Sequence, residues 1–128
     1  MIAAVCPATG GTDGIIMPHL DASVINLFLM VFSAQLASDV HAVILWDGAG
    51  FHTSGEVEVP SNVSLIRLPP YAPELNPIEN LWHYLRSHHW SNRFYPEWED
   101  LKEAAVTGIC AVGRNVGLIK NVCATSYL

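Results

Sequence analysis

The sequence predicts an α/β domain with a mixed sheet, and three features carry that prediction. Two short apolar runs near the start flank a cluster of turn residues, which is typical of a hairpin. Two further runs, Ala42–Trp46 and 63–68, are rich in β-branched residues. Apolar residues recur at helical spacing before and after these runs. Strands and helices that alternate in this way indicate a sheet covered by helices.

The composition limits the class of protein. The chain has 128 residues, 51% of them hydrophobic and 14% charged, which suits one ordinary domain and excludes a disordered chain. Eight prolines and nine glycines exclude a long coiled coil. Six Lys and Arg against twelve Asp and Glu give a net charge of −6. A self-sufficient nucleic-acid binder usually clusters basic residues, so this charge argues mildly against that class.

The cysteines and the apolar runs bear on location. Cys6, Cys110 and Cys123 are odd in number and widely spaced, which predicts reduced core thiols in a cytosolic protein. The N-terminus lacks the basic start and apolar run of a secretory signal. The most apolar stretch, 24–37, is shorter than the ~20 residues that span a bilayer. We therefore expect a cytoplasmic protein with no membrane partner.

The first elements follow from short signals. Ile2–Cys6 and 15–17 are predicted strands of an antiparallel hairpin, with its turn within 9–14. A helix begins after Asp21 or Ser23, either of which suits an N-cap, and continues to about residue 36. Because nearly all of its residues are apolar, this helix is predicted to pack on more than one side.

The later elements alternate. Ala42–Trp46 is continuously apolar, as in a strand buried on both faces, and 63–68 is a second strand that two prolines end. A helix then starts near Asn76 or Pro77, and 101–112 fits a further helix. The segment 113–128 has no clear period.

Asp47 is the first candidate functional residue. It directly follows a predicted buried strand, and open α/β sheets commonly carry their sites at the carboxyl ends of strands. Glycines on its C-terminal side leave room for a ligand near the backbone. The alternative is that Asp47 only begins a turn, because Asp-Gly is a frequent turn dipeptide.

Glu79 is the second candidate. Asn76 and Pro77 suit the N-cap and the first position of a helix, which places Glu79 at the third position. One interpretation is a capping box, in which Glu79 binds only the backbone of its own helix. The other is a carboxylate held opposite Asp47. Two carboxylates ~4 Å apart repel by about 4 kcal/mol at an effective dielectric of 20, so such a pair needs a cation. Oxygen ligands favour Mg²⁺ or Mn²⁺.

Two segments carry a family resemblance. AVILWDGAGFHTS at 42–54 and LPPYAPELNPIENLW at 68–82 resemble the catalytic domain of DDE transposases from bacterial insertion sequences of the mariner-related group. VCPATG at 5–10 resembles the early hairpin of that family, so the likeness covers roughly residues 2–95. It implies a ribonuclease H-like fold of three layers with a mixed sheet. It also implies metal-dependent DNA cleavage and strand transfer in DNA transposition.

The resemblance assigns roles to both carboxylates. In the family, three acidic residues hold two Mg²⁺ or Mn²⁺ ions, one at the nucleophile and one at the leaving oxygen of an in-line attack. By motif, Asp47 matches the second acid and Glu79 the third, so both are expected as catalytic residues and metal ligands.

The first acid has no counterpart in the matched segments. The family carries it on a first, central strand upstream of the hairpin. Asp13, Asp21 and Asp39 do not replace it, because they are predicted in a turn, at a helix start and in a loop. We therefore expect residues 1–128 to form one partial, N-terminally truncated catalytic domain, with 96–128 as a C-terminal helical segment. Without its central strand the sheet exposes unpaired edges, and the chain is expected to be inactive alone.

Five further residues are candidate DNA contacts. His52 lies in the first matched segment, Tyr71 and Asn76 lie in the second, and His83 and Arg86 follow Glu79 on the same predicted helical side. Each has an ordinary alternative: a surface histidine, loop support, an N-cap or a solvated helix face.

The expected partners are transposon ends and target DNA, and also a second copy or a full-length transposase. The competing hypothesis is a non-catalytic interaction module, or a decayed remnant, that associates with a full-length relative. A nuclease of the same superfold outside transposition is a third possibility.

Overall fold

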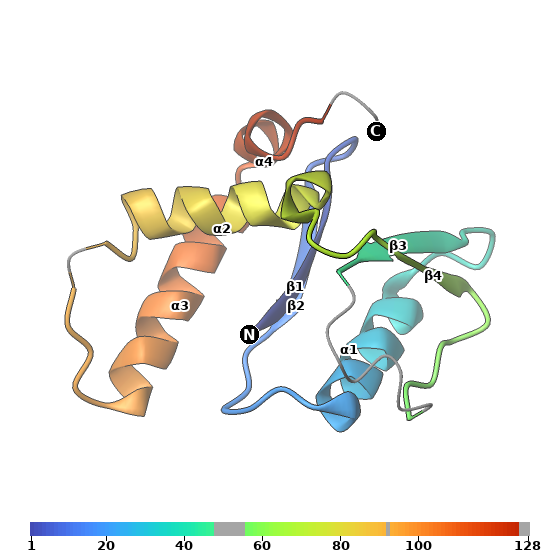
Figure 1. The fold of residues 1–128 in the computed structure, drawn as a ribbon, viewed down its shortest axis with the longest axis horizontal. Coiled ribbons are helices and arrows are strands. Elements are labelled where there is room, and N and C mark those ends of the chain that lie inside the picture. Colours follow the sequence, from blue (N-terminus) through green and yellow to red (C-terminus); the bar gives the residue numbers. More distant parts are fainter. Residues whose placement is uncertain (48–55, 92, 126–128) are drawn as a thin grey trace. The chain divides into compact units, whose positions relative to one another are not determined.

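The computed structural model describes residues 1–47, 56–91 and 93–125 (Figure 1). The chain divides into two compact units, one of Met1–Ala3 with Asp13–Asn76 and one of Ala4–Thr12 with Pro77–Leu128. The N-terminal hairpin therefore contributes to both units. Strands and helices both occur, so the chain has the mixed α/β composition that the sequence predicts.

The hairpin forms with a different second strand from the one expected. β1 (Ile2–Cys6) pairs with β2 (Gly11–Ile15), whereas the sequence suggested a strand at 15–17. The backbone N–H of Gly10 donates to the Cys6 carbonyl oxygen at 2.8 Å. The turn therefore lies at 7–10, earlier in the chain than the expected range within 9–14. Gly10 has a φ of +76°, a left-handed conformation that glycine adopts without strain. The glycine-rich segment is thus mostly strand.

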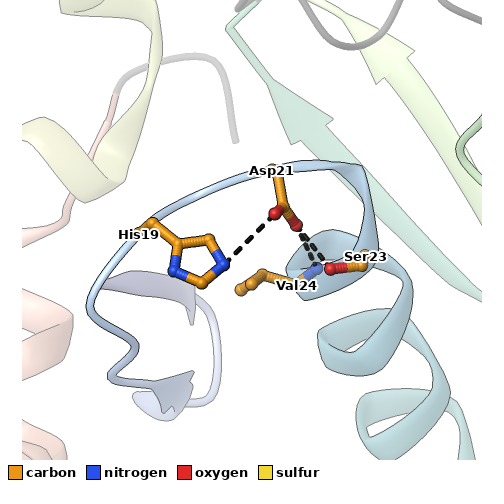
Figure 2. Close-up of polar contacts among 4 residues, drawn as sticks. All are labelled: His19, Asp21, Ser23 and Val24. Carbon is orange, nitrogen blue, oxygen red and sulfur yellow. Dashed lines mark hydrogen bonds and ion pairs between the residues drawn. The ribbon is translucent and has the colours of Figure 1, made fainter.

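Helix α1 (Ala22–Gln35) begins where the sequence predicts. Asp21 is its N-cap: the carboxylate accepts hydrogen bonds from the backbone N–H of Val24 at 3.1 Å and from the Ser23 hydroxyl at 2.5 Å (Figure 2). The expectation of packing on more than one side is wrong, because Met30 is 60% exposed. The buried residues lie along one side of the helix: Ala22, Val24, Ile25, Phe28 and Leu29.

Strands β3 (Ala42–Trp46) and β4 (Val63–Arg67) pair in parallel. Both lie close to the predicted ranges. The register sets Leu45 opposite Ile66, and successive residues point to opposite faces. One face therefore carries Val43 and Ile66, which are 57% and 50% exposed, while Val63 on the other face is buried. The prediction that β3 is buried on both faces is corrected by this exposed side.

Two polar side chains join α1 to the chain that precedes β4. The Asn26 amide donates to the Glu56 carbonyl oxygen at 2.9 Å and accepts from the Glu58 backbone N–H at 2.7 Å. One helical heptad later, the Ser33 hydroxyl donates to the Asn62 side chain at 2.5 Å, and Asn62 donates back to the Ser33 carbonyl oxygen. These bonds hold segment 56–62 along the helix, and Figure 1 shows α1 below the β3–β4 pair.

The second unit is helical apart from the hairpin. Its helices are α2 (Pro77–His88), α3 (Trp98–Gly113) and α4 (Val116–Val122). α2 and α3 occur where helices are expected, although α3 begins three residues before the predicted range. α4 lies in the segment without a clear period, and it contacts both α2 and α3. Five side chains at 2% exposure or less form the core: Leu81, Leu85, Val112, Ile119 and Cys123.

The described strands form two separate pairs, β1 with β2 and β3 with β4. The expected single mixed sheet, with its three layers, is therefore not formed by these residues. None of the described strands joins the two pairs.

All three cysteines are free, as predicted, but only Cys123 is buried in the core. Cys6 and Cys110 are exposed, because Cys6 ends β1 at the turn and Cys110 lies on an outward position of α3. Within the described ranges, no helix has the length and hydropathy to cross a membrane.

Candidate functional site

Asp47 lies at the carboxyl edge of the parallel strand pair. It directly follows β3, and it is exposed. The backbone N–H of Leu68 donates to the Trp46 carbonyl oxygen at 2.8 Å, so the chain after β4 stays paired with the end of β3. The proline-rich segment 68–76 therefore starts at the edge that presents Asp47. This edge is where parallel sheets commonly place their sites.

Segment 68–76 is ordered by its own hydrogen bonds. It contains the 3-10 turn η2 (Pro73–Leu75). The backbone N–H groups of Leu75 and Asn76 donate to the carbonyl oxygens of Ala72 and Pro73 at 3.1 and 2.9 Å. Tyr71 has a φ of +59°, a left-handed conformation that costs a non-glycine residue about 1–3 kcal/mol. Its side chain is fully exposed, at 101% of the reference area.

Asn76 bears on the alternative interpretation of Glu79. A capping box would use the backbone N–H of Asn76, but that group donates to Pro73. That N–H therefore has a partner outside the helix, and the capping-box interpretation of Glu79 stays an alternative. Asn76 is only 9% exposed and makes further interactions. A cap formed by its side chain stays a prediction.

Glu79 lies in the first turn of α2 and is half-buried. Its neighbours Ile78 and Leu81 are buried at 9% and 2% exposure, which fixes the rotation of the helix about its axis. The helix dipole favours a negative charge at this end. His83 and Arg86 are exposed four and seven positions later, so they share the side of the helix that carries Glu79.

The structure groups the predicted site residues in two sets. Asp47, Tyr71 and Asn76 belong to the first unit. The second set, in the other unit, is Glu79, His83 and Arg86. His52 lies outside the described residues.

The two predicted carboxylates are ligands of the type that a hard divalent cation prefers, but two are fewer than such a cation needs. Asp47 and Glu79 both offer carboxylate oxygens, which Mg²⁺ and Mn²⁺ accept. In the described part of the chain, no three His, Cys, Asp or Glu residues gather as metal ligands would. Each carboxylate would need further ligands to hold a metal ion.

Two other carboxylates have local partners. Asp13 lies on β2, not in the expected turn, and its carboxylate accepts from the Gly14 backbone N–H at 3.0 Å. Hydrogen bonds from Ser23 and Val24 hold the pKa of Asp21 below its usual value, and His19 lies 3.2 Å away (Figure 2). These contacts give Asp21 a capping role.

The second unit also contains a cavity that the sequence did not predict. It has a volume of about 570 Å³ and lies between the chain after α2 and one side of α3. The hydroxyl of Tyr95, which lines it, is buried and has no hydrogen-bond partner among the described residues. None of the predicted site residues lines this cavity. Its walls come from helix and loop residues without a recognisable motif, including His89, Arg93, Phe94, Asp100 and Glu103.

A mixed α/β chain with a carboxylate at the carboxyl edge of parallel strands, and another in the first turn of the next helix, fits the class of metal-dependent nucleases. Residues 1–102 match the family of DDE superfamily endonucleases, and the chain belongs to that family. This membership implies a ribonuclease H-like fold, a transposase-like nuclease function, a DNA substrate and the use of divalent metals.

A relative supports the same assignment. The chain is 36% identical over 111 residues to the uncharacterized protein y4pE/y4sA of Sinorhizobium fredii (strain NBRC 101917 / NGR234). The match covers 87% of this chain and 79% of the relative. No solved structure matches the chain.

Proposed function

We propose that the chain is part of an insertion-sequence transposase catalytic domain, which cuts DNA and transfers strands during transposition. Asp47 and Glu79 supply two of its three catalytic carboxylates. The observation that carries the proposal is the Leu68–Trp46 hydrogen bond. This bond places the start of segment 68–76, which leads to Glu79, at the sheet edge that presents Asp47. The chain also belongs to an endonuclease family.

The metal would be Mg²⁺ or Mn²⁺, with two ions in the complete domain. When bound, such ions activate an attacking oxygen and stabilise the leaving oxygen at a phosphodiester. Asp47 and Glu79 would hold them through carboxylate oxygens. Buried neighbours in α2 would keep Glu79 in place, which reduces the reorganisation needed on binding.

The first acid would come from another segment or another chain. Asp21 is committed to its helix N-cap, and the Asp13 carboxylate on β2 accepts from the Gly14 backbone N–H. A strand that carries the missing acid could also join the two strand pairs. On this proposal residues 1–128 are one partial catalytic domain, 96–128 is its helical extension, and these residues alone are inactive.

The DNA contacts would come from both units. His83 and Arg86 can carry positive charge on the exposed side of α2, which suits phosphate groups of transposon ends or target DNA. Tyr71 and Asn76 of the first unit, and His52, are the other proposed contacts. Acting on bacterial DNA, the protein would work in the cytoplasm.

The exposed face of the β3–β4 pair favours a second candidate function. Val43 and Ile66 leave an apolar surface on a pair of parallel strands, and parallel sheets are usually covered on both faces. A non-catalytic module that docks on a full-length transposase through this face would bury it. Such a module would associate without needing a divalent metal.

A DNA-nicking assay with Mn²⁺ tests the first proposal. We expect no cleavage by the chain alone. We expect cleavage when the chain is mixed with a full-length relative in which the second catalytic acid has been replaced. Strong cleavage by the chain alone would contradict the missing-acid proposal. Size-exclusion chromatography of the same mixture, with and without Mg²⁺, tests the module: metal-independent association without cleavage would favour it.

A further inference from the structure

We propose that Tyr71 is a stacking platform for an unpaired nucleobase of the DNA substrate. The inference rests on the proposed function, because it names a feature of the substrate at the same site. It predicts that the chain prefers DNA with an unstacked base over a perfectly paired duplex.

The exposure of Tyr71 and its backbone conformation are the first support. The side chain is 101% exposed, so the aromatic ring packs against none of the residues that the structure describes. Its backbone nevertheless adopts a left-handed φ of +59°, which glycine or asparagine would adopt more readily. A bulky residue in such a conformation with no packing to explain it indicates a role outside the fold.

The second support is that the ring is presented from an ordered segment. Leu68 is hydrogen-bonded to Trp46 before it, and the turn of Ala72 to Asn76 is hydrogen-bonded after it. Pro69 and Pro70 restrict the backbone on the N-terminal side. Because this segment is already ordered, binding a ligand would cost little conformational entropy.

The chemistry of the segment favours a base over a phosphate. Residues 68–76 contain one charged side chain, the carboxylate of Glu74, which repels phosphate. An aromatic face binds nucleobases by stacking and tolerates any base. Bases offer a free face only where DNA is frayed, bulged or single-stranded. The segment begins at the edge that presents Asp47, so the unpaired base would lie near the proposed cleavage site.

The test measures binding of the full chain to two DNA hairpins by fluorescence anisotropy. One hairpin is fully paired, and the other has a single bulged 2-aminopurine, whose fluorescence falls when it stacks on an aromatic ring. Tyr71→Asn removes the ring and suits the left-handed backbone, whereas Tyr71→Phe keeps the ring. Phe94→Asn is the matched control, because Phe94 is 87% exposed and lies in the other unit.

We expect the wild type, Tyr71→Phe and Phe94→Asn to bind the bulged hairpin more tightly and to quench 2-aminopurine. We expect Tyr71→Asn to lose the quenching and about tenfold in affinity for the bulged hairpin. Equal quenching by Tyr71→Asn, with thermal unfolding unchanged, would overturn the inference and leave the proposed function intact. If the wild type binds neither hairpin, the proposed function fails together with the inference.

Discussion

At the scale of single residues, local chemistry was predictable and burial was not. Asp21 was predicted as a cap because an Asp side chain just before a helix can accept from a backbone N–H of the first turn, which is that of Val24 here. Cys6 was predicted to be buried, but its exposure depends on where the hairpin turns. The turn is set by the pairing of β1 with β2, which single residue types do not report. Asp47 and Glu79 were singled out because Asp47 directly follows a predicted strand and Glu79 lies at the third position of a predicted helix, and their catalytic role stays a prediction.

Cys6 and Cys123 should differ in reactivity. Hydrogen bonds from the side chain and backbone of Thr9 lower the pKa of the Cys6 thiol from 9.0, and burial raises that of Cys123. At neutral pH we expect a thiol reagent to modify Cys6 readily and Cys123 only after unfolding. Mass spectrometry of the labelled peptides would show this, with exposed Cys110 as the internal reference. Equal labelling of Cys6 in Thr9→Val and in the wild type would contradict the role of Thr9.

The Asp21 cap should make stability depend on pH. Its pKa is lowered below 3.8 in the folded chain, chiefly by the Ser23 hydroxyl and then by the Val24 N–H. The carboxylate therefore stabilises the fold above pH about 3.8, and this contribution is lost as pH falls through the lower folded value. We expect Asp21→Ala to lower the urea midpoint at pH 7 and to approach the wild type as the pH falls well below 3.8. An Asp21→Ala deficit that stays constant with pH would contradict this account.

At the scale of elements, continuous patterns were predictable and tertiary anchors were not. β3 matched its predicted bounds because a β-branched run ends abruptly at Asp47. β2 was missed because its glycines resemble a turn, and pairing with β1 overrides that local preference. Asn26 and Ser33 are polar residues seven positions apart in an apolar helix. That spacing was the sequence feature that could have indicated their contacts with one segment, 56–62.

Asn26 should contribute more to stability than its exposure suggests. Asn26→Ala removes two hydrogen bonds, to Glu56 and Glu58, and we expect a loss of about 1 kcal/mol in the free energy of unfolding. Met30→Ala is the matched control on the same helix, because Met30 is 60% exposed. Urea denaturation would compare them. Equal unfolding free energies for the two variants would show that the Asn26 anchor adds no stability.

At the scale of the whole molecule, the sequence predicts the elements but not their assembly. The mixed α/β class and the two carboxylates follow from local patterns. The single sheet that we expected does not follow from local patterns. Joining β1 and β3 needs long-range pairing that the described strands do not make. The 570 Å³ cavity was missed because its walls, the chain after α2 and one side of α3, meet only when that loop folds against the helix.

The core of the second unit should depend strongly on Leu85. This side chain has 0% exposure in α2, so Leu85→Ala would leave a cavity and destabilise the unit by about 2–5 kcal/mol. Thermal unfolding followed by circular dichroism would measure the loss. Arg86→Ala is the control for helix propensity, because Arg86 is the exposed neighbour in the same turn. A smaller loss for Leu85→Ala than for Arg86→Ala would contradict the described core.

The central claim is that Asp47 and Glu79 are catalytic carboxylates of one metal-dependent site. The most direct measurement is Mn²⁺-dependent nicking of DNA by the chain supplemented with the full-length relative described above, using Asp47→Asn, Glu79→Gln and the exposed control Glu74→Gln. We predict that the first two variants lose at least a hundredfold in rate while the control keeps the wild-type rate, with all three folded. Nicking at the wild-type rate by either of the first two variants would contradict the claim.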